Sequence, residues 1–423
     1  MKHTNSKLPE SSTSILVTKC QVCNNTRLEE ILFLGYLPPV NGFETIGTLP
    51  HEQPSYPAQV LFCSTCHLVQ LGLVIRPDIL FPKSYPYTSS TTRILRENFV
   101  DLYKECTKLV VLTQKDLIID IGSNDGNLLN NFKDHHKVLG ITPEDIGKLA
   151  ISKGIPTMLE YFTTETTRKV LKQYGRAKII TATNVFAHIY NPNEVLNNII
   201  NLLIPDGVFI SESHYLYSLI KTIQYDTIYH EHLRYYSLAS LKYLLELNGL
   251  EIFHAKQIPT HGGSIRVYAA RKGHYRIKST VQALLKKERN IVTKKESLVM
   301  FKNRVVLSKL NLLSLLKGIK AKKKCIVGIS APSRATTLIN YCGIDDGIID
   351  YVVEVNGSYK IGKYIPGTVI PVFEESKFYE HQPDYALLLS WHIAKEIIPK
   401  LKENGYKGKY IIPLPRPRIV SEF

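Results

Sequence analysis

Apolar runs of strand length alternate with stretches of helical periodicity through the middle of the chain. The strand candidates are LIIDIG (117–122), KVLGIT (137–142), AKIITATN (177–184) and GVFISES (207–213). Amphipathic stretches such as TTRKVLKQYG and EVLNNIINLL lie between them. Strands separated by helices predict an α/β fold with a parallel, doubly wound sheet. SIRVYAAR (264–271) alternates apolar and polar positions, which predicts an antiparallel strand at the edge of this sheet.

The same rhythm returns after residue 320. The apolar runs KCIVGIS, IDYVVEVN, YALLLSW and KYIIPLP alternate with short helical patterns, which predicts a second, smaller Rossmann-like domain. A run rich in Lys and Leu and free of proline joins the two α/β regions at 278–320. We expect it to form an amphipathic linking helix with a solvated charged face.

The first 75 residues lack this periodicity and carry two CxxC pairs. Each CxxC turn points two sulfur atoms at one place, and two such turns supply the four thiolates of a tetrahedral zinc site. The predicted ligands are Cys20, Cys23, Cys63 and Cys66. A redox pair or four unrelated buried cysteines are the alternatives, but a redox CxxC normally stands alone. Four sulfur ligands leave no open position, so this zinc is expected to be structural.

Composition and charge narrow the class of protein. The chain has 423 residues, 44% of them hydrophobic and 21% charged, as in soluble globular proteins of two or three domains. The net charge of +16 suits an anionic partner, such as a phosphate-bearing substrate, RNA or a membrane surface. A polar N-terminus, few cysteines and no apolar run of membrane-spanning length lead us to expect a cytoplasmic protein.

A glycine-containing loop follows the first strand of the central sheet. Asp120 ends the strand, and Gly122 and Gly126 come next in the spacing D-x-G-x-x-x-G. The pyrophosphate-binding motif G-x-G-x-x-G is absent. The spacing fits the first loop of Rossmann-like methyltransferases, in which Asp120 would face the ammonium group of S-adenosylmethionine. An ordinary turn between a strand and a helix is the alternative.

The segment YDTIYHEHLRYYS (225–237) gathers an unusual number of groups that can exchange protons. His230 and His232 are two positions apart, which points them the same way only in an extended segment. Zinc proteases carry H-E-x-x-H on a helix instead, so the spacing argues against a metal here. An acid–base cluster remains, with plain packing as the alternative, and we expect His230 to be scaffold.

Two further stretches are candidates for ligand contact. His261-Gly-Gly-Ser264 is either a tight hairpin turn or a wall of a substrate pocket. Trp391 and His392 follow an apolar strand, and open α/β sheets bind ligands beyond the carboxyl ends of their strands.

These motifs in order resemble the sugar C-methyltransferases that act on nucleotide-linked 4-keto-deoxysugars. The resemblance covers nearly the whole chain and rests on the two CxxC pairs, YPYTSS, DIGSNDGNLL, TNVFAHIYNP, GVFISESHYL, YDTIYHEHLRYYSL and HGGSIRV. It implies a zinc-binding module (1–75), an S-adenosylmethionine-binding domain (76–277), the linking helix (278–320) and a C-terminal Rossmann-like domain (321–423). The active site would lie between the domains.

The resemblance also implies roles for individual residues. The residues that match catalytic positions are Tyr229, Glu231, His232 and His188. Those that match cofactor-binding positions are Asp120, Gly122, Asn124, Asp125 and Asn184. Those assigned to substrate binding are Tyr85, Tyr87, His261 and Arg334.

The chain departs from the family pattern at two places. The family tends to read G-x-E-P after the second strand, where the acidic group holds a ribose, but this chain has Gly140-Ile141-Thr142-Pro143. Glu144 is the nearest replacement. In the C-terminal domain, Ser330 stands at a glycine position and Arg334 where lysine is usual.

Methylation of carbon needs a base near the carbon and a hydrogen-bond donor near the ketone oxygen. We expect His232 to be the base, Tyr229 and His188 to be donors to the enolate oxygen, and Glu231 to orient a histidine or bind a sugar substituent. The predicted activity is S-adenosylmethionine-dependent C-methylation of a nucleoside-diphosphate 4-keto-deoxysugar.

Two alternatives remain open from the sequence. One is an O-methyltransferase acting on a glycan or small metabolite. The other is a zinc-containing nucleic-acid-binding protein, which the CxxC pairs and the positive charge suggest. No nucleic-acid recognition motif accompanies them, so we expect no nucleic acid as a partner. We also expect no membrane as a partner, because no apolar run reaches membrane-spanning length. The sequence is compatible with a monomer.

Overall fold

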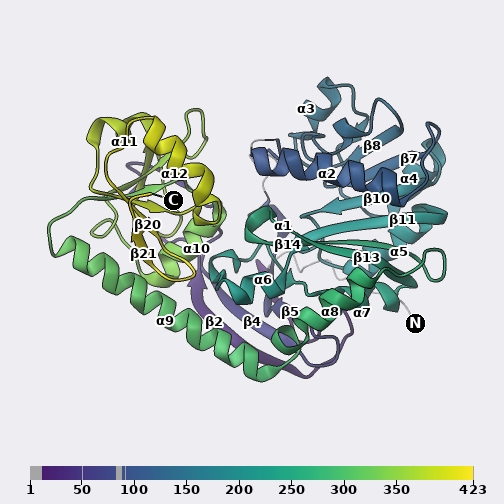
Figure 1. Ribbon diagram of the computed structural model, residues 1–423, viewed down its shortest axis with the longest axis horizontal. Helices are drawn as coiled ribbons and strands as arrows, with labels where there is room; N and C mark the ends of the chain where they lie inside the picture. The colour runs from purple at the N-terminus through teal and green to yellow at the C-terminus, as the bar shows by residue number, and fades with distance from the viewer. Residues whose placement is uncertain (1–11, 50, 82–87, 91, 423) are drawn as a thin grey trace.

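Two α/β lobes stand on either side of a smaller sheet in the computed structural model (Figure 1). The structure describes residues 12–49, 51–81, 88–90 and 92–422. The predicted substrate residues Tyr85 and Tyr87 lie outside these ranges. The lobe on the right of Figure 1 carries the central sheet, the lobe on the left is formed by the C-terminal residues, and α9 runs between them. No helix of the described residues is long and apolar enough to cross a membrane.

The central sheet has seven strands in the order β13-β14-β11-β10-β7-β8-β9. The five parallel strands are β7 (Leu117–Ile121), β8 (Lys137–Ile141), β9 (Thr157–Met158), β10 (Ala177–Thr183) and β11 (Leu203–His214). The helices of this lobe are α1 (Pro77–Leu80), α2 (Arg93–Leu109), α3 (Gly147–Ser152), α4 (Thr164–Gln173), α5 (Pro192–Leu202), α6 (Leu216–Lys221) and α7 (Leu238–Leu247), with 3-10 turns η1 (Leu129–Asn131), η2 (Tyr225–Thr227) and η3 (Thr260–Gly262). The predicted doubly wound α/β sheet is confirmed.

The antiparallel part of this sheet is one strand larger than expected. β14 (Ser264–Arg271) is an antiparallel strand as predicted and pairs with β11, but β13 (Leu250–Ile258) lies outside it and forms the edge. The edge position predicted for 264–271 is therefore wrong. The sequence of β13 hides its strand character because residues 252–255 are all buried, so apolar and polar positions do not alternate there.

The C-terminal lobe holds an eight-stranded sheet in the order β21-β20-β19-β15-β16-β18-β17-β3. The predicted runs form the parallel strands β15 (Ile326–Ile329), β16 (Tyr351–Glu354), β19 (Tyr385–Leu388) and β20 (Lys409–Ile412). The remaining strands are β17 (Lys363–Tyr364), β18 (Pro371–Glu374) and β21 (Arg418–Val420), and the helical elements are α10 (Ser333–Cys342), α11 (Glu375–His381), η4 (Trp391–Ile393) and α12 (Ala394–Glu403). The second Rossmann-like sheet is thus present.

The linking segment folds as two helices, α8 (Ser279–Val292) and α9 (Lys295–Lys320). Thr293 bonds its hydroxyl back to the Arg289 carbonyl, and Lys294 is extended, so the chain turns between them. The buried face of α9 includes Leu312, which shares one apolar core with Leu34 of the N-terminal module and Leu338 of α10. The lobes are therefore packed around a common core.

The N-terminal module contributes strands to more than one sheet. Its own antiparallel strands are β2 (Leu28–Leu37), β4 (Tyr56–Cys63) and β5 (Val69–Leu71), and a small separate pair is formed by β1 (Ser14–Leu16) and β6 (Leu73–Ile75). The fourth strand of the first sheet is β12 (Arg234–Tyr235), which lies within the segment 225–237. In turn β3 (Glu44–Thr45) pairs with β17 of the C-terminal sheet.

Candidate active site

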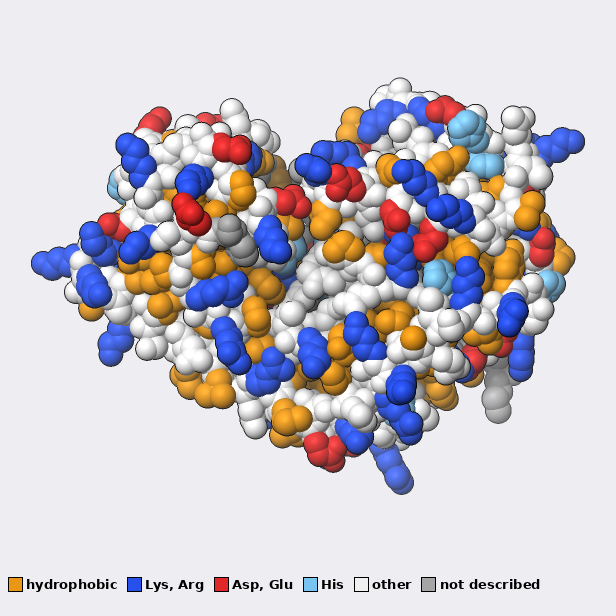
Figure 2. Space-filling view, viewed as in Figure 1, with side chains coloured by type: hydrophobic (Ala, Val, Ile, Leu, Met, Phe, Trp, Pro, Cys, Tyr) orange, Lys and Arg blue, Asp and Glu red, His pale blue; other side chains and the backbone are white. Residues whose placement is uncertain are grey.

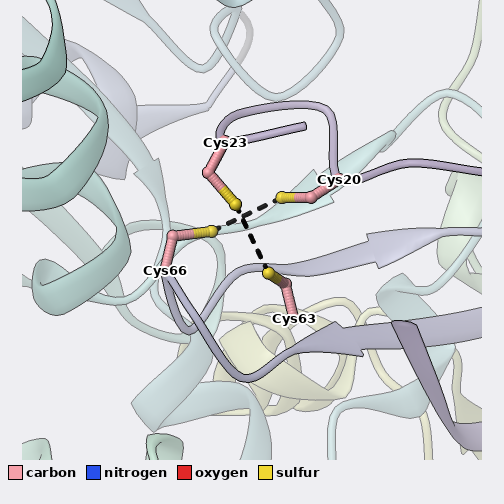
Figure 3. Close-up of side chains that lie close together, drawn as sticks. All are labelled: Cys20, Cys23, Cys63 and Cys66. Atoms are coloured by element: carbon pink, nitrogen blue, oxygen red, sulfur yellow. Dashed lines mark hydrogen bonds between the residues drawn. The ribbon is translucent and has the colours of Figure 1, made fainter. Parts of the chain in front are cut away.

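The four cysteines of the N-terminal module converge on one point (Figure 3). Cys20 and Cys23 lie on the loop between β1 and β2, Cys63 ends β4, and Cys66 lies in the turn before β5. The Sγ atoms lie within 4.8 Å of one another, with 3.4 Å between those of Cys20 and Cys66 and 3.5 Å between those of Cys23 and Cys63. Tetrahedral zinc with Zn–S bonds of ~2.3 Å needs sulfurs ~3.8 Å apart, so the cluster fits a zinc ion held by four thiolates.

The zinc loop also braces the segment that we predicted to be catalytic. Gln21, which lies between the first two cysteines, accepts a hydrogen bond at 2.6 Å from Nη1 of Arg234. The backbone N–H of Gln21 donates to Oε1 of Gln70, and Gln70 is the β5 partner of Arg234 in the sheet. A metal at the cluster would therefore stabilise the end of the 225–237 segment as well as its own module.

Asp120 lies at the carboxyl end of β7, where a ligand of a doubly wound sheet would bind. It is almost fully buried, and its Oδ1 accepts a hydrogen bond from the Thr181 hydroxyl at 2.6 Å. The pKa of Asp120 is raised to about 7, mainly by burial; the Thr181 hydrogen bond lowers it and the nearby Glu212 carboxylate raises it. Because burial disfavours the charged form of a carboxylate, a cationic partner such as an ammonium group would stabilise the charged form strongly.

The loop after Asp120 turns tightly against the end of β10. Gly122 has φ +71°, and a Cβ there would lie 2.3 Å from Cγ2 of Val185. Asn184, the residue before Val185, is also left-handed with φ +58° and donates its N–H to the Glu212 carbonyl. The predicted cofactor residues Gly122 and Asn184 are therefore brought together by the fold.

Asn124 and Asp125 hold the chain that leads into α2. Oδ1 of Asn124 accepts from the Ser89 N–H at 2.9 Å, and Oδ1 of Asp125 accepts from the Ser89 hydroxyl at 2.5 Å. The second oxygen of the buried Asp125 lies 3.6 Å from Nζ of Lys153. Asn124 and Asp125 are therefore held in place within the loop that is expected to bind the cofactor.

Buried polar atoms gather at these strand ends without a hydrogen-bond partner in the described part of the chain. They are Ser123 Oγ, Asp125 Oδ2, Ser211 Oγ and Ser213 Oγ. After β8, the Thr142 hydroxyl donates to Glu144, which places a carboxylate where the family pattern would have its ribose contact. An acidic, hydroxyl-rich lining of this kind fits a ligand that carries an ammonium group and a ribose, as S-adenosylmethionine does.

A β-turn brings Tyr229 and His232 together. The His232 N–H donates to the Tyr229 carbonyl at 2.9 Å, so the two side chains leave the same end of the turn, with ring centres 4.2 Å apart. The central residues of the turn point elsewhere: His230 Nε2 lies 3.2 Å from the Pro57 carbonyl, and Glu231 accepts from the Asn41 amide at 2.7 Å. The extended geometry considered for His230 and His232 does not occur, because the turn separates them.

The hydrogen bonds of the two predicted active-site histidines define their tautomers. Nδ1 of His232 lies 2.9 Å from the Thr227 carbonyl, and Nδ1 of His188 lies 2.6 Å from the Glu231 carbonyl. Since a carbonyl only accepts, each Nδ1 carries the hydrogen and each Nε2 keeps its lone pair in the neutral ring. The rings are 4.9 Å apart, so the fold gathers two groups that can take a proton.

Burial sets the charge of these groups. It lowers the pKa of His232 well below 6.5, and the neighbouring rings of His188 and His214 lower it further. Burial also lowers the pKa of His188 to about 4, although the Glu231 carbonyl opposes it. The pKa of Tyr229 is raised well above 10, first by burial and then by the Glu231 carboxylate. Near neutral pH the histidines are therefore neutral and Tyr229 keeps its phenolic hydrogen.

Three more histidines lie close to this pair. His214 ends β11, with its ring centre 5.9 Å from that of His232 and its Nε2 2.7 Å from the His261 carbonyl. His261 has φ +54° in η3, and burial lowers its pKa to about 4. Burial and the charges of Arg334 and His261 lower the pKa of His392 in η4 well below 6.5. His214 was missed from the sequence, although its place at the end of a parallel strand was a usable signal.

Arg334 reaches the segment 225–237 from the other lobe. It lies in the first turn of α10, is 6% exposed, and places Nε 3.2 Å from Oδ2 of Asp226. Its Nη2 donates to Oε1 of Gln224 at 3.0 Å, and its guanidinium lies 5.2 Å from the centre of the Trp391 ring. The predicted substrate residue Arg334 is therefore also a contact between the two lobes, which the sequence did not indicate.

Figure 2 shows a hollow between the two lobes, with Lys and Arg side chains more abundant than acidic ones on this face. The carboxyl ends of β10 and β11 carry Asn184 and His214 in the central lobe, and α10 and η4 carry Arg334 and His392 in the C-terminal lobe.

Comparisons with known proteins agree with this arrangement. Residues 20–81 match a zinc binding domain family, residues 94–255 a methyltransferase domain family, and residues 259–415 the C-methyltransferase C-terminal domain family. The C-methyltransferase NovU of Streptomyces niveus is 32% identical over 412 residues, which is 96% of this chain and 97% of that protein.

Solved structures of methyltransferases align with part of the chain. A methyltransferase from Anabaena variabilis is 13% identical, with a TM-score of 0.34, over 43% of this chain and 86% of its own. Magnesium protoporphyrin IX methyltransferase from Synechocystis is 15% identical, with a TM-score of 0.32, over 42% of this chain and 79% of its own. It is the near full-length match to NovU, together with the three matching domain families, that places this chain in the family of S-adenosylmethionine-dependent C-methyltransferases with a zinc-binding domain.

Proposed function

We propose that this methyltransferase acts on a nucleoside-diphosphate-linked 4-keto-deoxysugar and transfers the methyl group to a carbon next to the ketone. The observation that carries the proposal is the pairing of Tyr229 and His232 at the ends of one β-turn. An enolate forms when a base removes a proton from the carbon and a hydrogen-bond donor stabilises the charge on the oxygen. A neutral imidazole with a free lone pair can act as the base, and a phenol that keeps its hydrogen can act as the donor.

His232 is the proposed base. Its Nε2 lone pair would take the proton from the carbon next to the ketone, and the electrons of the broken C–H bond would spread onto the ketone oxygen. The Thr227 carbonyl, which accepts from Nδ1, would stabilise the imidazolium that forms. A positioned base of this kind contributes ~10²–10⁴-fold to a rate.

Tyr229 is the proposed donor to the enolate oxygen. Its raised pKa means that it stays protonated while the oxygen gains charge, so it can donate throughout the step. His188 has its Nδ1 hydrogen committed to the Glu231 carbonyl and a pKa lowered to about 4. In the neutral ring, Nε2 of His188 is a hydrogen-bond acceptor. We therefore propose that His188 accepts a hydrogen bond from a substrate hydroxyl and that Tyr229 alone donates to the enolate oxygen.

S-adenosylmethionine, when bound, supplies an electrophilic methyl group on a sulfonium. Asp120, Gly122, Asn124, Asp125 and Asn184 would hold it at the carboxyl ends of β7 and β10. Asp120 would pair with its ammonium group, and Glu144 would accept from a ribose hydroxyl. The new carbon–carbon bond would form as the carbon–sulfur bond breaks, and the bonding electrons would remain on sulfur.

The rest of the site supports a polar, anionic substrate. Glu231 is held by Asn41 and would accept from a sugar hydroxyl, and His261 would line the pocket. Arg334 keeps Nη1 buried without a partner among the described residues, and the chain carries a net charge of +16. Tyr85 and Tyr87 remain proposed substrate contacts from the resemblance.

Calorimetry and product analysis test this proposal. S-adenosylhomocysteine should bind, and dTDP-4-keto-6-deoxyglucose should bind more tightly in its presence. Incubation with S-adenosylmethionine should give a methyl group that NMR places on carbon. A methyl group on oxygen would support an O-methyltransferase instead, and salt-sensitive RNA binding without binding of S-adenosylhomocysteine would support a nucleic-acid-binding protein.

A further inference from the structure

Asp226 is a buried carboxylate beside the catalytic turn for which the proposed reaction has no use. It lies in η2, is fully buried, and precedes Thr227, whose carbonyl accepts from Nδ1 of His232. A carboxylate in such a place must be paired, because burying an isolated charge is costly. Both of its described charged or polar side-chain partners come from the C-terminal lobe.

The contacts of Asp226 are close and directional. Its Oδ2 accepts from Nε1 of Trp391 at 2.7 Å and lies 3.2 Å from Nε of Arg334. Trp391 and Arg334 belong to η4 and α10, so a turn of one lobe is fastened to two elements of the other. Arg334 is further held by Gln224, the residue before η2.

The chain on both sides of Thr227 is contacted by the same lobe. The Thr337 hydroxyl of α10 lies 3.4 Å from the Ile228 carbonyl, and the Tyr225 hydroxyl lies 3.4 Å from Sγ of Cys342. The C-terminal lobe therefore contacts the chain before and after the carbonyl that faces His232. Since neighbouring peptide planes share a Cα, fixing the residues on both sides fixes the direction of that carbonyl.

We propose that Asp226 is a positioning residue through which Arg334 and Trp391 of the C-terminal lobe aim the Thr227 carbonyl and so hold His232 in the tautomer that leaves Nε2 free. If the carbonyl turned away, the Nε2–H form of the ring would become populated, and that form has no lone pair facing a substrate. The C-terminal lobe would thereby control the state of the base without touching the reacting carbon. The inference rests on the proposed role of His232 for its effect on catalysis, but not for its effect on the tautomer.

The test compares Asp226→Asn with Glu288→Gln in the full-length, zinc-loaded protein. Glu288 is also fully buried, and it accepts from the Tyr215 hydroxyl and from the N–H groups of Leu238 and Ala239, away from the turn. Nitrogen-15 NMR of labelled histidine, with His232→Gln to assign the signal, reports the tautomer directly. The binding of S-adenosylhomocysteine, measured by calorimetry, shows whether each variant is folded.

In the wild-type protein and in Glu288→Gln, His232 should be in the Nδ1–H form, whereas Asp226→Asn should show a mixture of both forms. Asp226→Asn should also lower kcat about 10- to 100-fold, as expected when a supporting contact of a catalytic group is lost. Asp226→Asn/Arg334→Gln removes the unpaired cation and should recover stability but neither the tautomer nor the rate.

Several results would overturn the inference. These are an unchanged tautomer in Asp226→Asn, an equal change in Glu288→Gln, or full recovery of the tautomer in the double variant. If Asp226→Asn alters the tautomer but the wild-type protein methylates no 4-ketosugar, the positioning role stands and the proposed function falls. If Asp226→Asn does not fold, Trp391→Phe removes one contact of the carboxylate and should change the tautomer in the same direction.

Discussion

The Asn41 side-chain amide donates to Oε1 of Glu231 at 2.7 Å, across 190 positions of the chain. Tyr359 of the C-terminal lobe donates in turn to Oδ1 of Asn41 at 3.2 Å. Glu231 lies in the β-turn between Tyr229 and His232, so the N-terminal module, the central lobe and the C-terminal lobe all contribute to the position of one carboxylate. The site is therefore assembled from three parts of the chain that are distant in sequence.

Asn41→Ala should weaken the binding of the sugar substrate and leave that of S-adenosylhomocysteine unchanged. A hydrogen bond to a charged group is worth about 1.5–3 kcal/mol, which corresponds to a loss of about 10- to 100-fold in kcat/KM. Tyr359→Phe keeps the Asn41–Glu231 hydrogen bond and should have a smaller effect. Equal losses in the two variants would contradict a direct role for Asn41.

His232→Asn should lower turnover by ~10²–10⁴-fold, because His232 is the group proposed to take the proton from carbon. Affinity for S-adenosylhomocysteine, measured by calorimetry, should stay near that of the wild type. His230→Gln is the matched control, since His230 faces the Pro57 carbonyl and the Tyr56 ring instead of the site. A His232→Asn variant that keeps the wild-type rate would disprove the assignment of the base.

The protein should lose stability as the pH falls below ~6.5, the ordinary pKa of histidine in the unfolded chain. Burial lowers the pKa of His188, His230 and His261 to about 4 in the folded protein. Between the two pKa values the unfolded chain binds more protons, so the free energy of unfolding rises with pH across this interval and falls as acid is added. Urea unfolding from pH 7 to pH 4 measures it, and His230→Gln should flatten the slope.

Cys63→Ser should reduce bound zinc, lower the melting temperature and impair turnover. The turnover loss is expected because the zinc loop holds Arg234 through Gln21, close to the proposed base His232. Metal analysis, thermal unfolding and an activity assay on the same preparation would show the three effects together. Cys325 is a half-buried cysteine of the C-terminal lobe, outside the four-cysteine cluster. The Cys325→Ser variant is the control and should bind zinc and turn over like the wild-type protein.

Asp120→Asn should weaken S-adenosylhomocysteine binding about 10- to 100-fold while preserving the hydrogen bond from Thr181. The physical reason is the loss of charge opposite an ammonium group at a site shielded from water. Asp116 lies just before the same strand and outside the site, so the Asp116→Asn variant should bind S-adenosylhomocysteine with wild-type affinity. Calorimetric titration of both variants distinguishes loss of a cofactor contact from general damage to β7.

Much of the fold follows from local pattern, whereas the details of the site depend on contacts between distant segments. The parallel strands and the cysteine cluster could be predicted because apolar runs and CxxC spacing are local signals. The strand β13 was missed because full burial removes alternation. Asn41 and Asp226 could not be assigned because their importance comes from partners that lie far along the chain. The pairing of Tyr229 with His232 depends on the β-turn, which the spacing of the histidines alone did not predict.

The exchange of strands between sheets bears on how the chain matures during synthesis. Until residues 234–235 leave the ribosome, β5 has no partner on its outer side, and β3 must wait for residues 363–364. Unpaired strand edges are templates for aggregation, so nascent or truncated chains carry a hazard that the finished protein does not. Fragments cut between the lobes are therefore expected to be poor substitutes for the whole enzyme, because each would leave behind a strand that another part of the chain requires.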